Sequence, residues 1–258
     1  MNDLTPSTFL QAIAGELDVL ASFRTITGFE PDKFQRTLLV TGPEEPLIAC
    51  LAGRGTGKSL TIAIKAICHA NTTRDAVVLC LSASLKQATE LFRTIKIVHS
   101  KLPLAHMITR ETAFMIQLQN GARIIVISAS ESTSRGYRAT LILADEAARI
   151  EDEIFTSLIP SLVANGQIVL VTTPNGARGF FYEVFTEGRA FTITAKSTDL
   201  PRMKAICDRD QALMSESQFR AEHLCSFQGS ADNAFFSFGL IQDAFANDIK
   251  PANIQGLW

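Results

Sequence analysis

The sequence predicts an α/β fold with a mostly parallel sheet flanked by helices, and three observations support this class. Short segments that are nearly all apolar and rich in β-branched residues alternate with longer, helix-like segments. Strands that are apolar throughout are typical of parallel sheets covered on both faces. With 258 residues, 47 % of them hydrophobic, the chain has the size at which one large α/β domain plus a small appendage is usual.

The expected elements follow one another in the order of right-handed βαβ units. We expect strands at 47–52, 76–82, 140–145 and 167–173, and helices at 58–71, 84–101 and 152–164. In 113–128, two β-type runs flank Asn120-Gly121, which is a strong signal for a hairpin turn. A β-hairpin is therefore expected before the third core strand.

The region after about residue 198 is expected to differ from the sheet. Its sequence from 201 to 227 is charged and compatible with helices, and a tail rich in phenylalanine follows. The aromatic residues of this tail are Phe235, Phe236, Phe238, Phe245 and Trp258. We therefore predict a core at 1–198, which includes an N-terminal helical segment, and a small helical subdomain at 199–258.

Charge and cysteine content set broad limits on the class of protein. The net charge of -2 and the pI near 6.1 show no global basic character, so they neither support nor exclude DNA as a partner. Five cysteines without C-x-x-C spacing indicate reduced thiols in a cytosol-like compartment. The sequence shows neither a signal peptide nor a long uncharged apolar run, so we expect a soluble protein without a membrane partner.

The run from Ala52 to Ser59, Ala-Gly-Arg-Gly-Thr-Gly-Lys-Ser, follows a predicted strand and opens a predicted helix. This context is the one a phosphate-binding loop requires, because glycines let backbone N–H groups turn inward and the helix N-terminus adds its positive dipole. Lys58 would reach the β- and γ-phosphates, and the Ser59 hydroxyl would bind Mg²⁺. The sequence therefore predicts that ATP with Mg²⁺ binds residues Gly53, Arg54, Gly55, Thr56, Gly57, Lys58, Ser59 and Leu60.

The apolar run 140–144 ends abruptly in two acids, Asp145 and Glu146. A buried strand of this kind places them at the carboxyl edge of the sheet, where ligands of open α/β folds bind. Asp145 would hold the Mg²⁺ shell, and Glu146 would orient and deprotonate the attacking water. Acids after a strand also serve as helix caps, which is the alternative. The adjacent acids indicate the P-loop branch with an additional strand and a catalytic glutamate, and we associate that extra strand with 76–82.

Two arginines are candidates for stabilising the phosphoryl group in the transition state. Arg54 lies in the loop itself, whereas Arg135 lies on a polar loop before the acidic strand and could serve a neighbouring subunit. For Arg135 the alternative is an ordinary solvated arginine.

Three further positions and one upstream glutamine have weaker signals. Thr172, Thr173 and Pro174 end the last predicted strand, where the hydroxyls could contact the γ-phosphate or merely terminate the strand. Gln35 precedes the first core strand, and its amide could pair with the adenine edge, although such a residue is usually part of the surface.

Taken in order, these pieces resemble the ATPase domain of the large terminase subunit, the DNA-packaging motor of tailed bacteriophages. The resemblance runs from about residue 35 to 198, and the loop arginine and the Asp-Glu-Ala-Ala run at 145–148 are its most specific parts. It implies that Gln35 contacts adenine, that Arg135 is a finger offered in trans, and that 172–174 is a coupling motif. It also implies that 199–258 is a lid subdomain. The family's RNase H-like nuclease domain is expected to be absent, because no second carboxylate cluster is seen.

The resemblance implies an ATPase that drives double-stranded DNA into a viral procapsid. Its partners would be DNA, further copies in a ring, the portal protein and the small terminase subunit, in the host cytoplasm and transiently at the portal vertex. DNA would be gripped by its phosphates rather than its bases. One alternative is a helicase-like DNA-dependent ATPase, which would need a second RecA-like domain. Another is a nucleotide-binding assembly module with little turnover.

Overall fold

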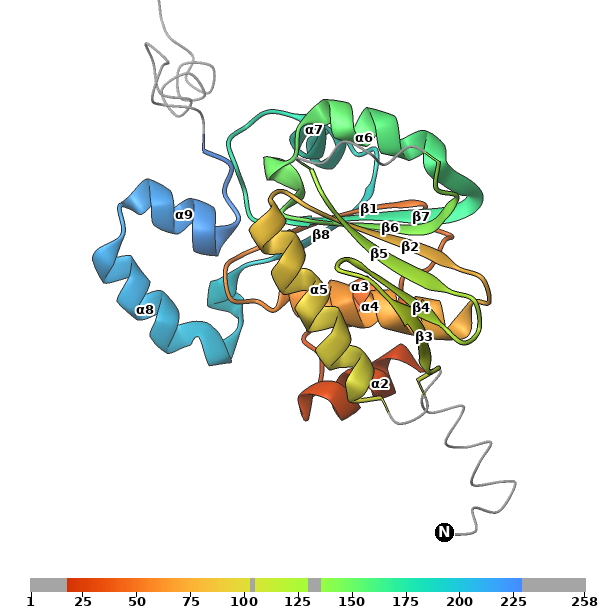
Figure 1. Ribbon diagram of the computed structural model, residues 1–258. Coiled ribbons are helices and arrows are strands. Elements are labelled where there is room, and N and C mark those ends of the chain that lie inside the picture. Colours follow the sequence, from red (N-terminus) through yellow and green to blue (C-terminus); the bar gives the residue numbers. More distant parts are fainter. Residues whose placement is uncertain (1–17, 103–104, 130–135, 229–258) are drawn as a thin grey trace, which may run out of the picture.

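The computed structural model describes residues 18–102, 105–129 and 136–228 (Figure 1). Within these ranges, eight strands form one sheet in the order β3-β4-β5-β2-β6-β7-β1-β8. The strands are β1 (Leu47–Ala52), β2 (Val77–Ser82), β3 (Ile108–Glu111), β4 (Met115–Leu118), β5 (Arg123–Ser128), β6 (Ala139–Asp145), β7 (Leu162–Thr172) and β8 (Phe191–Ala195). In this order, every pair of neighbouring strands from β5 through β2, β6, β7 and β1 to β8 is parallel, whereas β3-β4 and β4-β5 are antiparallel.

Helices cover both faces of the sheet, as Figure 1 shows. The longer helices are α2 (Val19–Thr27), α3 (Lys33–Val40), α4 (Lys58–Thr72), α5 (Leu85–Ser100), α6 (Asp152–Leu158), α7 (Phe180–Thr186), α8 (Lys204–Leu213) and α9 (Glu216–Leu224). α2 to α5 lie on one face, and α6 and α7 lie on the other. The predicted sheet of mostly parallel strands flanked by helices is therefore confirmed.

Two hydrophobic cores, one on each face, explain why the central strands are apolar throughout. In β1, Cys50 and Ala52 pack into the core under α4, whereas Ala49 and Leu51 pack into the core under α6 and α7. Because successive side chains of a strand point to opposite faces, both alternating sets must be apolar. All five cysteines are buried and free of disulfides.

The β4-β5 hairpin forms where the sequence predicts it. Gly121 has a φ of 85°, and a Cβ there would lie 2.0 Å from the Asp75 carboxylate. The positive φ therefore favours glycine at this turn, and a Cβ would also displace the exposed Asp75 side chain. β5 continues into the parallel sheet beside β2, so the hairpin extends the core sheet rather than interrupting it.

The additional strand between the loop strand and the acidic strand is β7, which pairs with both β1 and β6. Our association of that strand with 76–82 was wrong, because β2 pairs with β5 and β6 and lies beyond the acidic strand. The order of strands in the sheet is set by packing between distant segments. The order of strands along the sequence therefore does not show which strand lies between β1 and β6.

The helix expected at 152–164 is also corrected, because α6 ends at Leu158. A 3-10 turn, η2 (Ile159–Ser161), follows and contains Pro160, and β7 begins at Leu162. Proline cannot donate a backbone hydrogen bond, so it favours this early end. β3, β8 and α7 were not predicted; β3 and β8 are short strands with partly exposed residues, which weakens the apolar signal.

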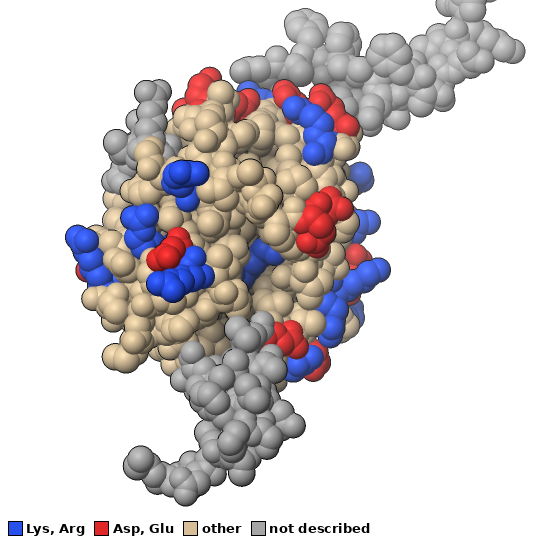
Figure 2. Space-filling view, turned by 90° about the vertical axis from the view of Figure 1, so that its right-hand side faces the viewer, with Lys and Arg blue, Asp and Glu red and all other residues tan. Residues whose placement is uncertain are grey.

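The helices α8 and α9 lie beside the carboxyl ends of the strands (Figure 1). They follow two short turns, η3 (Ser197–Asp199) and η4 (Pro201–Met203). The division at residue 198 stays a prediction, and the phenylalanine-rich tail lies outside the described residues. None of the described helices is long and apolar enough to cross a bilayer. On the face shown in Figure 2, lysine and arginine side chains are interspersed with acidic ones.

Candidate active site

The loop between β1 and α4 has the backbone shape that its glycines permit. Gly57 is the N-cap of α4 and has a φ of 91°, a region in which residues with a Cβ are strained. A Cβ at Gly57 would also lie 2.9 Å from the Gln35 amide nitrogen. The loop therefore turns directly into the helix N-terminus, which leaves the positive end of the α4 dipole at the carboxyl edge of the sheet.

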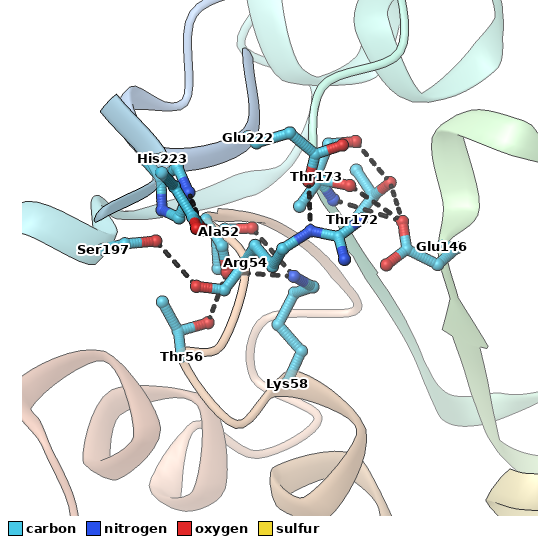
Figure 3. Close-up of polar contacts among 12 residues, drawn as sticks. Ala52, Arg54, Thr56, Lys58, Glu146, Thr172, Thr173, Ser197, Glu222 and His223 are labelled. Atoms are coloured by element: carbon cyan, nitrogen blue, oxygen red, sulfur yellow. Dashed lines mark hydrogen bonds and ion pairs between the residues drawn. The ribbon is translucent and has the colours of Figure 1, made fainter. Parts of the chain in front are cut away.

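Lys58 is buried and folds back over the start of the loop (Figure 3). Its Nζ donates to the carbonyl oxygens of Ala52 at 3.1 Å and Gly53 at 3.0 Å. The Thr56 hydroxyl donates to the same Gly53 oxygen at 2.8 Å. The ammonium group thus lies where a phosphate chain over this loop could replace two neutral acceptors with charged ones, which form stronger hydrogen bonds.

The loop and the acidic strand are joined by a direct hydrogen bond from Ser59 Oγ to Asp145 Oδ2, 2.6 Å long. Burial raises the pKa of Asp145 above its usual range, and the Ser59 bond opposes this effect. A hydroxyl and a carboxylate are oxygen donors of the kind Mg²⁺ prefers, and Mg²⁺ is usually held by one or two carboxylates plus substrate phosphates. Ser59 and Asp145 therefore fit a magnesium ion that arrives with a nucleotide.

Glu146 adopts a left-handed conformation with a φ of 53°, which is uncommon for residues other than glycine and is often found at functional sites. Its Oε2 accepts a hydrogen bond from Thr173 Oγ1 at 3.0 Å and lies 3.4 Å from Thr172 Oγ1. Arg149 Nε is 3.7 Å from the same oxygen. The candidate base is thus held by the threonines at the end of β7 (Figure 3).

A cleft of about 550 Å³ brings these groups together. The lining residues are Arg54, Gly55, Gly57, Lys58, Ser59, Gln87, Glu146, Arg149, Thr173 and Glu222. The candidate phosphate-binding loop, the candidate base and one threonine of the 172–174 segment therefore face one space, although they come from three separate parts of the sequence.

Helix α9 closes one side of the cleft through Glu222. Its carboxylate forms an ion pair with Arg54 Nε at 2.8 Å, and its backbone oxygen accepts from Arg54 N at 2.7 Å (Figure 3). The hydrogen bond to Glu222 raises the pKa of Arg54. Burial acts to raise the pKa of Glu222, but Arg54, Arg149 and Lys58 together leave it lowered. The carboxylate thus stays charged among the cations of the cleft.

Glu222 and Arg149 were not found by sequence reasoning. Arg149 follows the acidic pair on η1 (Ala147–Arg149) and could have been suggested by its distance of three residues from Glu146. Glu222 lies 168 residues from Arg54 in a charged helix, so no local signal points to it.

Gln35 is buried behind the loop rather than open to the cleft. Its Oε1 accepts from Asp32 N at 2.9 Å, and its Nε2 donates to Thr56 O at 3.2 Å. Arg202 Nη2 donates to the same Thr56 oxygen at 2.8 Å and pairs with Asp32. Both ends of the Gln35 amide are therefore engaged by protein here, and its contact with adenine stays a prediction.

The remaining predicted residues are placed differently. Leu60 is partly buried and packs against the core under α4, so it supports the loop from the helix side. Pro174 is buried directly after Thr173. Arg135 lies outside the described residues, and its role as a finger in trans stays a prediction.

The chain matches one protein-family model, described as terminase large subunit, T4likevirus-type, N-terminal, over residues 49–240, more than half of its length. No curated protein sequence matches the chain.

Solved structures with similar folds include three phage proteins. The large terminase ATPase domain of Thermus phage P74-26 is 19 % identical with a TM-score of 0.67, and the alignment covers 80 % of this chain and 97 % of that domain. The large terminase of HK97 bacteriophage is 15 % identical with a TM-score of 0.64, covering 77 % and 51 %. That of a thermophilic bacteriophage, solved in complex with ATP-gamma-S, is 13 % identical with a TM-score of 0.60, covering 76 % and 52 %. The chain thus spans about half the length of the last two proteins.

These likenesses confirm the predicted fold class, a P-loop NTPase domain.

Proposed function

Because this chain belongs to the family of T4-like-virus-type large terminase subunits, which it matches through their N-terminal region, we propose that it hydrolyses ATP to drive double-stranded DNA into a viral procapsid. The observation that carries this proposal is the hydrogen bond between Ser59 and Asp145, which joins the phosphate-binding loop to the acidic strand at 2.6 Å. The ATP-gamma-S complex of the similar phage terminase supports ATP as the nucleotide.

The reaction follows from the positions of Lys58 and Glu146 around the cleft. Lys58 would leave the carbonyl oxygens of Ala52 and Gly53 and bind the β- and γ-phosphates. The oxygen of a water molecule attacks the γ-phosphorus, the bond from that phosphorus to the oxygen of the ADP leaving group breaks, and Glu146 accepts the proton of the water. Mg²⁺, held by Ser59 and Asp145, would neutralise charge on the phosphates. The products are ADP and phosphate.

Arg54 would join the phosphates after its release from Glu222, and Arg135 would approach the γ-phosphate from the next copy in a ring. Both contributions stabilise the charge of the transition state. Gln35 would read the adenine edge once its amide is freed from Thr56.

Coupling to DNA movement would pass through the end of β7. Thr173 donates to the Glu146 carboxylate at 3.0 Å, so a movement of the catalytic base would displace the segment 172–174 directly. Pro174, which fixes its own φ, would convert that change into a movement of the following chain. This supports Thr172, Thr173 and Pro174 as the coupling segment.

The proposed partners follow from the family and from the physics of DNA. Double-stranded DNA would be held through its phosphates, without preference for sequence. A ring of copies on the portal protein, supplied with DNA by the small terminase subunit, would act in the host cytoplasm and at the portal vertex of the procapsid.

The test is the rate of ATP hydrolysis per chain, measured against protein concentration with and without duplex DNA. A rate that rises steeply with concentration and with duplex DNA supports a ring motor with an arginine in trans. Stimulation by single strands alone would favour the helicase-like alternative, and nucleotide binding without turnover under any condition would favour an assembly module.

A further inference from the structure

Ser82 has an unusual environment at the carboxyl end of β2. Among the side chains that the structure describes, its Oγ is the one buried nitrogen or oxygen atom without a hydrogen-bond partner, and the residue is 0 % exposed. Its backbone oxygen is satisfied by Ala129 N at 2.9 Å, so the deficit concerns the hydroxyl alone. A buried hydroxyl without a partner is costly, and in native proteins it often indicates an absent water or ion.

Strand register places Ser82 beside Asp145. The two residues are partners in the parallel ladder between β2 and β6, so their side chains point to the same face of the sheet from strands about 4.8 Å apart. Two positions earlier, Cys80 and Leu143 are partners and both belong to the core under α4. The Ser82 hydroxyl therefore lies on the α4 side, the side from which Ser59 reaches Asp145.

The two oxygens of Asp145 are already used by other groups. Oδ2 accepts from Ser59, and Oδ1 accepts from the Glu146 backbone N–H at 3.1 Å. Ser82 does not bond either oxygen, although it is the neighbour in the ladder. Polar groups that lie close but beyond direct hydrogen-bond distance are commonly bridged by water.

The chain that follows Ser82 leads into the cleft. Helix α5 begins three residues later, and Gln87 in its first turn lines the cleft with Ser59 and Glu146. The β2–α5 junction therefore forms a wall of the same site and is not a remote part of the core.

We propose that Ser82 is a positioning residue of the magnesium site, and that its hydroxyl hydrogen-bonds a water molecule bound to the ion held by Ser59 and Asp145. Mg²⁺ usually keeps several of its waters in protein sites, and those waters donate hydrogen bonds to nearby acceptors. Such outer contacts orient the inner ligands and typically change metal affinity by about 10- to 100-fold when they are removed. The inference rests on the proposed function, since it requires a magnesium nucleotide in the cleft.

The test is the affinity of Ser82→Ala for a fluorescent ADP analogue, measured in Mg²⁺ and in EDTA. We expect the variant to bind about tenfold more weakly than the unmodified protein in Mg²⁺, with no difference in EDTA. Ser128→Ala is the matched control, because Ser128 pairs with Ser82 in the next ladder, one strand farther from Asp145. The control should keep the full effect of Mg²⁺.

Thermal unfolding without nucleotide separates this role from a structural one. If the Ser82 hydroxyl stabilised the fold, removing it would lower the Tm of the protein. Because the hydroxyl has no partner in the nucleotide-free protein, the Tm of Ser82→Ala should stay the same or rise. An equal effect of Mg²⁺ on Ser82→Ala and the unmodified protein, or a fall in the Tm of the variant, overturns the inference alone. Failure of the unmodified protein to bind the nucleotide in Mg²⁺ overturns the proposed function as well.

Discussion

Glu222 is predicted to compete with the nucleotide for the cations of the cleft. Its carboxylate pairs with Arg54 at 2.8 Å, and the charges of Arg149 and Lys58 also lower its pKa. ATP bound as proposed would bring several negative charges to the same space, so Arg54 would have to leave Glu222 before it binds a phosphate. Glu222→Gln keeps the size of the side chain and the backbone contact to Arg54 N but removes the charge.

The exposure of the ion pair sets the size of the effect. The Arg54 side chain is 63 % exposed and that of Glu222 is 23 % exposed, so the pair contributes at most about 1 kcal/mol. Without this competition, the affinity for ATP analogues should rise by up to about fivefold. The same loss should lower the Tm of the nucleotide-free protein by no more than about 4 °C.

The assay is titration of Glu222→Gln with a non-hydrolysable ATP analogue at low and high salt. Because the effect is electrostatic and partly exposed, the difference from the unmodified protein should shrink at high salt. Glu216→Gln is the control, since Glu216 lies on the same helix and pairs only distantly with Arg220, at 3.8 Å. Weaker binding by Glu222→Gln would refute the reasoning, because Glu222 would then assist the nucleotide.

Three other perturbations test other parts of the structure. Burial, with the charge of Lys65, lowers the pKa of His69 to about 4 in the folded protein. In the unfolded chain, the same imidazole has the ordinary histidine pKa of about 6.5. The free energy of unfolding should therefore fall by about 3 kcal/mol as the pH falls from 6.5 to 4. In His69→Gln, the free energy measured by urea unfolding should depend less steeply on pH over this range. Thr173→Val removes the donor to Glu146 and should slow hydrolysis about tenfold without changing the nucleotide Kd, whereas Thr186→Val should leave both unchanged. Gly57→Ala, at a φ of 91°, should weaken nucleotide binding in the same titration, and unaltered affinity would contradict the loop geometry.

The parts of the site that could be predicted are those encoded by short runs of sequence. The loop before α4 and the acids that end β6 each combine a strand signal with a chemical signal over fewer than ten residues. The Asn120-Gly121 hairpin is similar, because its turn depends on the φ of one glycine.

The parts that could not be predicted depend on contacts between distant segments. Nothing near Arg54 indicates that Glu222 pairs with it, because the contact exists only when α9 lies against the loop that follows β1. The place of β7 between β1 and β6 is likewise a property of the assembled sheet. The engagement of Gln35 by Thr56 depends on how α3 lies against the loop.

The central claim is that the terminal phosphate of ATP faces Glu146 across the cleft, and single-turnover hydrolysis by Glu146→Gln tests it most directly. The rate of the chemical step should fall by about 10²- to 10⁴-fold while the affinity for ATP is retained. Glu151→Gln, which changes an exposed acid nearby, should behave like the unmodified protein. A Glu146→Gln variant that hydrolyses ATP at the unmodified rate would show that Glu146 is not the catalytic base.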